Sequence, residues 1–169
     1  MASLLALGAA SAQGDSQYLY LRTPNAAVTA RVNGESVTGP DLQLSRDGKT
    51  LRGRAFGRAV FLGLNGKELG GTLGSELSRL SFEDKDGVTQ ARGTFYGHIA
   101  ELNLSNEELT GTVGPCSYDL KITPDEVYMG SRSCGGPPER PVVLAIPPAL
   151  AQQGQAMTLA TLAILLGTP

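Results

Sequence analysis

Residues 52–74 read RGRAFGRAVFLGLNGKELGGTLG, and residues 92–114 read RGTFYGHIAELNLSNEELTGTVG. The two segments align without a gap at an offset of forty positions, with ten identical pairs. A more degenerate copy lies at 27–39 (AVTARVNGESVTG), which aligns with 59–71 and keeps the Asn-Gly dipeptide. Repetition at a fixed period indicates that the fold is assembled from one supersecondary unit used several times.

Short segments in which every second residue is apolar recur along the chain, each followed by a turn signal. After 60–64 (VFLGL) the signal is Asn65-Gly66, and after 80–82 (LSF) it is Asp86-Gly87. These dipeptides supply the positive φ angles of tight hairpin turns, and alternation places the apolar side chains on one face. The unit is therefore a β-hairpin of about twenty residues, used six or seven times. The other alternating segments are 28–32, 42–44, 100–104, 118–122 and 142–146.

The predicted fold is all-β, an antiparallel up-and-down meander over about residues 17–146 with a short C-terminal helix. The sheet could close as a two-layer sandwich, a barrel or a stacked solenoid. A closed barrel of twelve to fourteen strands would enclose more volume than the Leu and Val side chains of these segments fill. Three units of four strands would also fit a trefoil or a prism, but the aromatic signatures of those folds are missing.

Strand length counts against one form of closure, a membrane-spanning barrel. The alternating segments have five or six residues, fewer than the nine to eleven or so that a membrane-spanning strand needs. Between the hairpins, bends or bulges that let the sheet curl are expected at Gly53 and Gly57, and again at Gly93 and Gly97.

The two cysteines predict a disulfide within one hairpin. Pairing Ile122 with Tyr128 and Leu120 with Gly130 sets Cys116 directly opposite Cys134, within bridging distance. In this register Cys116 shares the inward face with Tyr118, Leu120 and Ile122. Closing the loop would stabilise the fold by about 3 kcal/mol on the chain-entropy model. The alternative is a pair of buried free thiols.

The N-terminus predicts export. An apolar run over 4–10 precedes a small-x-small site at 10–12 (ASA), which resembles the end of a signal peptide without its basic n-region. We assign residues 1–12 to a signal peptide remnant, with Gln13 as the first mature residue, and residues 13–146 to the repeat-built β domain. Secretion, or residence in the periplasm or cell envelope, also agrees with a disulfide.

Residues 147–169 form an uncharged C-terminal tail, in which 156–166 is an apolar run rich in helix formers. Eleven residues are too few to cross a bilayer as a helix, so no spanning membrane segment is expected. We predict a helix over 156–166 that lies across an open end of the sheet core. The alternative is a membrane- or partner-binding tail.

Composition excludes several functions. The net charge is -2 and no basic run exists, so nucleic acid is not an expected partner. The chain contains no P-loop, dinucleotide fingerprint, Cys-x-x-Cys or Gly-x-Ser-x-Gly motif, and no cofactor is expected.

Three sets of residues are weak candidates for chemistry. His98 is the one histidine, and it is a catalytic candidate without marked Ser or Asp partners. Glu83, Asp84 and Asp86 resemble part of a calcium loop, but a charged hairpin turn is the simpler interpretation. Arg52, Arg92 and Arg132 recur at the offset of forty, and either recognise an acidic polymer or pair with neighbouring carboxylates.

The sequence thus favours an exported, non-catalytic β-repeat protein with a structural or binding role at the cell envelope or outside the cell. An envelope or surface partner would suit this role. One alternative is a carrier that holds a small apolar ligand inside the β core. A second is a hydrolase with a site on the inter-hairpin loops, near His98 or the acidic residues 83–86.

Overall fold

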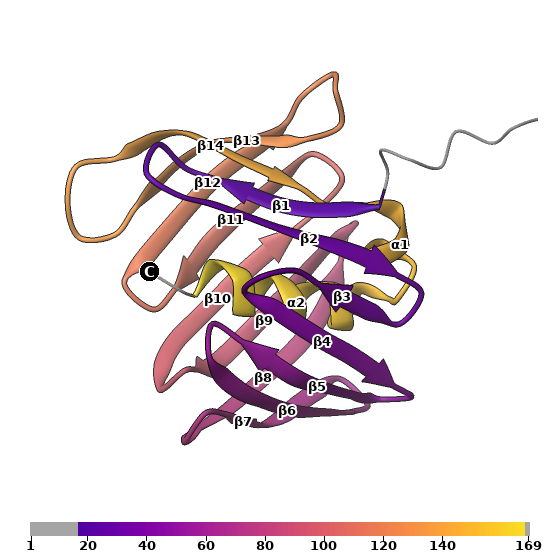
Figure 1. Ribbon diagram of the computed structural model, residues 1–169. Coiled ribbons are helices and arrows are strands. Elements are labelled where there is room, and N and C mark those ends of the chain that lie inside the picture. Colours follow the sequence, from indigo (N-terminus) through magenta and orange to yellow (C-terminus); the bar gives the residue numbers. More distant parts are fainter. Residues whose placement is uncertain (1–16, 168–169) are drawn as a thin grey trace, which may run out of the picture.

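The computed structural model describes residues 17–167, and its strands form one closed antiparallel barrel (Figure 1). Each strand pairs with its neighbours in sequence, and β1 pairs with β14 to complete the ring. The predicted meander is therefore confirmed, and its closure is a barrel. The strands are β1 Tyr18–Arg22, β2 Ala27–Asn33, β3 Ser36–Thr38, β4 Leu42–Asp47, β5 Thr50–Ala55, β6 Arg58–Asn65, β7 Glu68–Leu73, β8 Glu76–Lys85, β9 Val88–Phe95, β10 His98–Leu104, β11 Glu108–Val113, β12 Cys116–Ile122, β13 Tyr128–Ser133 and β14 Glu139–Ala145.

The hairpin corners lie where the Asn-Gly and Asp-Gly dipeptides predict them. Gly34, Gly48 and Gly66 have φ angles of 56°, 59° and 60° between β2 and β3, β4 and β5, and β6 and β7. These turns lie at one end of the barrel, together with the Asp86-Gly87 turn between β8 and β9. We call this the Asn-Gly end.

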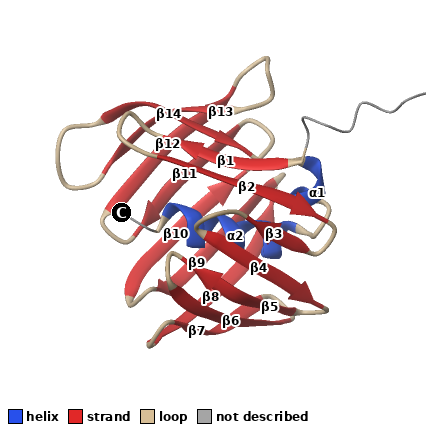
Figure 2. Cartoon of the chain, viewed as in Figure 1, coloured by secondary structure: helices blue, strands red, loops and turns tan. Residues whose placement is uncertain are grey.

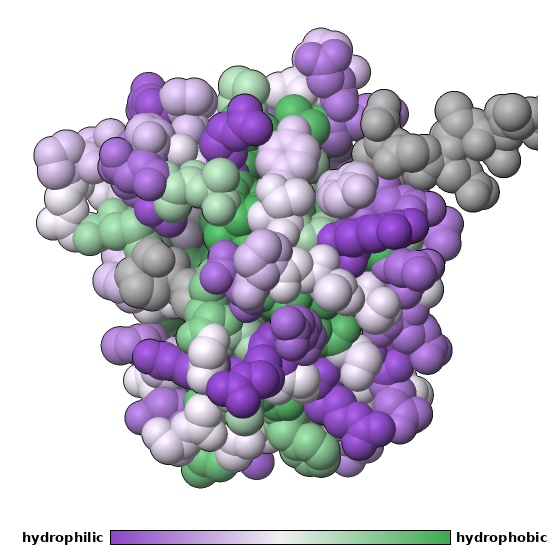
Figure 3. All heavy atoms as spheres, in the orientation of Figure 1, coloured by the Kyte–Doolittle hydropathy of each residue, from purple (hydrophilic) through white to green (hydrophobic). Residues whose placement is uncertain are grey.

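The alternating apolar residues line the interior, as predicted. Leu62, Leu102 and Leu120 are buried, while their neighbours in sequence on the same strands point outward. Ile122 differs from the prediction: it is 36% exposed, because β12 ends there and the strand end projects beyond the core. On the face shown in Figure 3, hydrophilic side chains are spread over the outer wall, with hydrophobic ones visible between them.

Of the bends or bulges predicted at Gly53 and Gly93, bulges are not present, since the strand register runs unbroken through both residues. Instead, each glycine lets two backbones approach closely. A Cβ atom on Gly53 would lie 1.9 Å from the carbonyl oxygen of Gln43, and one on Gly93 would lie 1.9 Å from that of Arg79. Both glycines have positive φ, 142° and 157°. The strongly coiled wall of the barrel therefore needs a residue without a side chain at these points.

The C-terminal helix lies inside the barrel, which corrects the prediction that it covers an open end. Helix α1 (Pro148–Ala151) follows β14 at the Asn-Gly end, and helix α2 (Gln155–Leu166) then runs through the lumen (Figures 1 and 2). The side chains over 157–166 are all buried, and they belong to the same core as the inward-facing strand residues. A helix that is apolar on every side is stable only where it is surrounded. It supplies the volume that the strand side chains alone do not fill.

Polar groups hold α2 at the Asn-Gly end and along its length. The side-chain amide of Gln153 donates a 2.8 Å hydrogen bond to the carbonyl oxygen of Gly34. The hydroxyls of Thr158 and Thr161 donate to carbonyl oxygens four residues earlier, so these two buried threonines are satisfied within the helix. Burial of these two hydroxyls in the lumen is thus compensated.

Candidate functional site

At the end of the barrel opposite the Asn-Gly end, two turns are repeat equivalents of one another. Phe56 and Gly57 connect β5 to β6, with φ angles of 51° and 77°, and Tyr96 and Gly97 connect β9 to β10, with φ angles of 55° and 74°. Positive φ at both central residues defines a type I′ turn. Such a φ is unusual for a bulky residue, and backbone outliers of this kind gather at functional sites.

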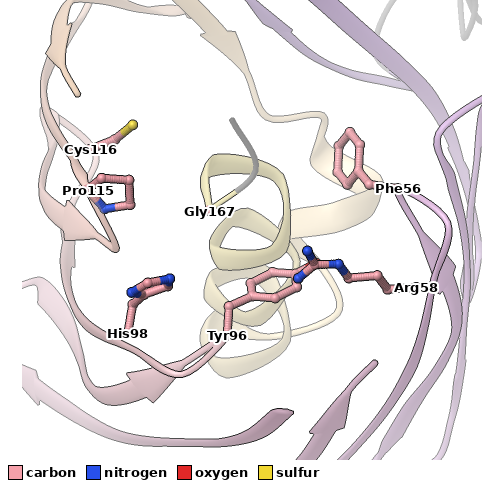
Figure 4. Close-up of a pocket in the computed structure, with 7 residues that line it drawn as sticks. All are labelled: Phe56, Arg58, Tyr96, His98, Pro115, Cys116 and Gly167. Carbon is pink, nitrogen blue, oxygen red and sulfur yellow. The ribbon is translucent and has the colours of Figure 1, made fainter. Parts of the chain in front are cut away.

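The two turns and the C-terminal end of α2 enclose a pocket of about 440 Å³, within the usual range for small-molecule sites. Its lining is Phe56, Arg58, Tyr96, His98, Pro115, Cys116 and Gly167. In Figure 4, His98, Pro115 and Cys116 form one side, Phe56 and Arg58 form the other, and the ring of Tyr96 lies between them. We call this the pocket end of the barrel.

Tyr96 is the central side chain of the pocket. Its ring is 5.6 Å from that of Phe95, edge to face, and the Arg58 guanidinium lies 5.1 Å from its centroid. Tyr96 is only 7% exposed, and its buried hydroxyl has no hydrogen-bond partner among the described residues. Burial raises the pKa of this hydroxyl, and Arg58 opposes that shift in part. Tyr96 therefore presents a neutral hydroxyl group that is free to bond.

Near the pocket, a cluster of polar side chains links α2 to the wall of the barrel. The Tyr118 hydroxyl donates a 2.8 Å hydrogen bond to the carbonyl oxygen of Leu166. Burial raises the pKa of Tyr118, and a hydrogen bond with Arg132 opposes the shift. Arg132 also forms an ion pair with Glu139, whose pKa its hydrogen bond lowers. A cation at the C-terminal end of a helix is electrostatically favourable, so this cluster stabilises the seated helix.

The predicted disulfide is present, in the predicted register. Ile122 pairs with Tyr128 and Leu120 with Gly130, and Cys116 is bonded to Cys134 across a Cα–Cα distance of 4.0 Å. Cys116 lines the pocket, so the disulfide also fixes one of its walls.

His98 lies at the pocket, directly after the Tyr96-Gly97 turn. Its ring packs against the turn at Gly114, where an added Cβ would be 3.6 Å from the imidazole. Within residues 17–167, the His98 side chain makes no hydrogen bond and no ion pair. The structure thus places His98 in a pocket but brings no base, nucleophile or orienting carboxylate into bonding contact with it.

Of the acidic candidates, Glu83 and Asp84 lie on opposite faces of β8, and Asp86 lies in the turn that follows. Glu83 and Asp86 border a shallow pocket on the outside of the wall, whereas Asp84 accepts a 2.5 Å hydrogen bond from the buried hydroxyl of Thr89. In the described part of the chain, no three His, Cys, Asp or Glu side chains are grouped so that they could hold a metal ion. The charged-turn interpretation fits this arrangement.

The periodic arginines are each paired with a carboxylate. Arg52 lies 3.0 Å from Asp47, Arg92 lies 3.4 Å from Glu101, and Arg132 pairs with Glu139. Arg132 differs from the other two in that it is largely buried, because it lies opposite the inward-facing Tyr118. The arrangement matches the interpretation as local ion pairs.

Comparison with known proteins adds no relative. No protein-family model, curated protein or solved structure matches this chain. Among residues 17–167, no helix has the length and apolar character needed to cross a membrane.

Sequence reasoning missed several pocket residues, among them Phe56, Arg58 and Tyr96. Their signal was present in the repeat, where Phe56-Gly57-Arg58 aligns with Tyr96-Gly97-His98. The turn was missed because neither copy has the Asn or Asp that usually precedes glycine in a type I′ turn. The offset of forty had singled out Arg132, and alternation had placed Tyr118 inward, but the contact of Tyr118 with Leu166 left no recognisable pattern.

Proposed function

We propose that the protein is exported and has a non-catalytic structural or binding role at the cell envelope or outside the cell. The observation that carries this proposal is a barrel whose own helix fills it and whose β12–β13 hairpin is cross-linked by a disulfide at the pocket end. Disulfides persist in oxidising compartments, which supports export. The leader-like residues 1–12, on which this part of the proposal also rests, lie outside the described part of the chain.

The arrangement of the interior favours this role over transport of an apolar ligand in the β core. A carrier needs a lined cavity inside its barrel. Here the lumen is occupied by α2, whose side chains over 157–166 are buried against the strands. Binding is therefore best supported at the ends of the barrel or on its outer wall.

Export is tested on the native protein recovered from its own cells. Fractionation should place it outside the cytoplasm, and mass spectrometry should find Gln13 as the first residue and Cys116 bonded to Cys134. An unprocessed cytoplasmic chain with two free thiols would refute export.

The non-catalytic role is tested separately. Purified protein should not turn over a panel of ester, glycoside and peptide substrates. Turnover that is lost in His98→Ala and retained in Arg52→Ala, a change on the outer wall, would establish an enzyme instead.

A further inference from the structure

We propose that the pocket at the pocket end of the barrel binds a small organic anion, a carboxylate with an apolar body. This inference rests on the binding half of the proposed function and names the class of ligand. The pocket combines an unpaired cation, an unpartnered buried hydroxyl and apolar walls, and each is set in place by one of the repeat-derived turns.

Arg58 supplies the positive charge of the pocket. Arg46, Arg52, Arg92 and Arg132 form ion pairs with carboxylates. Arg58 is one of the six arginines within residues 17–167 that do not, and it differs from the other five in that its guanidinium lies over the face of the Tyr96 ring. Because the ring holds the guanidinium in place, its planar set of N–H donors is pre-oriented for a carboxylate. The lining includes no acidic side chain.

The pocket also contains a buried hydroxyl group, that of Tyr96. A buried hydroxyl without a partner is rare in folded proteins, and each case asks for an explanation. Since burial keeps this group protonated, it is available as a hydrogen-bond donor. A ligand oxygen placed between Arg58 and Tyr96 would satisfy both groups at once.

The remaining walls of the pocket are apolar. Phe56, Pro115 and Cys116 present carbon and disulfide sulfur, which suit an aromatic ring or a short acyl chain (Figure 4). The C-terminal end of α2 carries partial negative charge and lies beside Gly167. It therefore disfavours an anionic head at that side and directs the carboxylate toward Arg58.

The repeat supplies the variants for the test. Tyr96 and Phe56 occupy equivalent positions in the two turns, with φ angles of 55° and 51°. Tyr96→Phe therefore removes the hydroxyl and introduces a residue that the equivalent turn already contains at this position. By the same equivalence, His98→Arg adds a cation that the other copy already carries at Arg58. Arg52→Gln is the matched control, since it removes an equal charge from the outer wall.

The experiment is an NMR titration of the full chain with phenylacetate and octanoate, and with phenylacetamide as the neutral isostere. At least one acid should shift the amide signals of Gly57, Gly97 and His98, and phenylacetamide should bind at least about ten-fold more weakly than phenylacetate. Arg58→Gln should weaken binding of the acid about ten-fold or more. Tyr96→Phe should weaken it several-fold, His98→Arg should strengthen it, and Arg52→Gln should change nothing.

Two results would overturn the proposal. In the first, neither acid shifts the pocket signals of the folded wild-type chain. In the second, the acid binds but Arg58→Gln behaves like Arg52→Gln, or the amide binds as tightly as the acid. Thermal unfolding of each variant establishes that it is folded. Either negative result leaves export and the lack of turnover untouched, because those are measured independently.

Discussion

The hydroxyl of Tyr118 in β12 donates a hydrogen bond to the carbonyl oxygen of Leu166 across 2.8 Å, which joins the wall of the barrel to the last turn of the helix inside it. Both groups are buried. Helix ends leave their final carbonyls without partners inside the helix, and here a strand supplies one. This bond fixes how far α2 extends toward the pocket.

Tyr118→Phe should therefore lower the free energy of unfolding by about 1–3 kcal/mol, because the Leu166 carbonyl would be left buried and unsatisfied. Urea titration followed by circular dichroism measures this change. Tyr18→Phe is the control, since Tyr18 is exposed and its hydroxyl makes no hydrogen bond in the described chain. Equal effects of the two variants would show that the contact with the helix contributes nothing.

Gly53→Ala should destabilise the barrel by at least about 2 kcal/mol, because the new Cβ would overlap the carbonyl oxygen of Gln43 and force β4 and β5 apart. Gly136→Ala provides the comparison. That glycine has open space around it and no positive φ, so its substitution should change stability by less than about 0.5 kcal/mol. The measurement is again urea unfolding. A neutral Gly53→Ala would disprove the close backbone approach.

Replacing both cysteines by alanine should lower stability by about 3 kcal/mol, since the disulfide closes a loop between residues separated by 18 positions. The wild-type chain unfolded in the presence of a reductant should show the same loss. If thiol reagents label Cys116 and Cys134 in the folded, unreduced wild-type protein, the disulfide is absent.

Stability should decrease above about pH 10. Burial raises the pKa of Tyr96, Tyr118 and Tyr128 in the folded chain, whereas in the unfolded chain tyrosine ionises near pH 10. The stabilisation from these three groups is thus complete below pH 10 and is lost as the pH rises toward their folded pKa values. Urea unfolding at about pH 8 and about pH 10.5 measures the loss. Tyr128→Phe should reduce the difference between the two pH values, and an unchanged difference would contradict the assignment.

The wall of the barrel could be predicted because the sequence signals that specify it are local. Alternation at 60–64 and 100–104, and Asn-Gly or Asp-Gly at the corners, determine which side chains face inward and where the chain reverses. The disulfide followed from the same register arithmetic. Ile122 was assigned to the core by alternation alone, which does not indicate where a strand leaves the core.

The location of α2 depends on the closure of the sheet into a barrel, and no local sequence pattern predicts that closure. The relevant signal was the lack of a polar side over 156–166, because a helix that covers an open end would have one face in water. The pocket depends on two turns that are forty positions apart but meet at one end of the barrel. Its key residues, Arg58 and Tyr96, become neighbours only in the folded, curved sheet.

The position of α2 in the chain also sets the order of assembly. The ribosome makes every strand of the wall before it makes the helix that occupies their centre, and β1 must wait for β14 before the ring can close. The native state is therefore reached only after residue 166 has emerged. Folding of such a chain is therefore completed late and involves the whole domain at once.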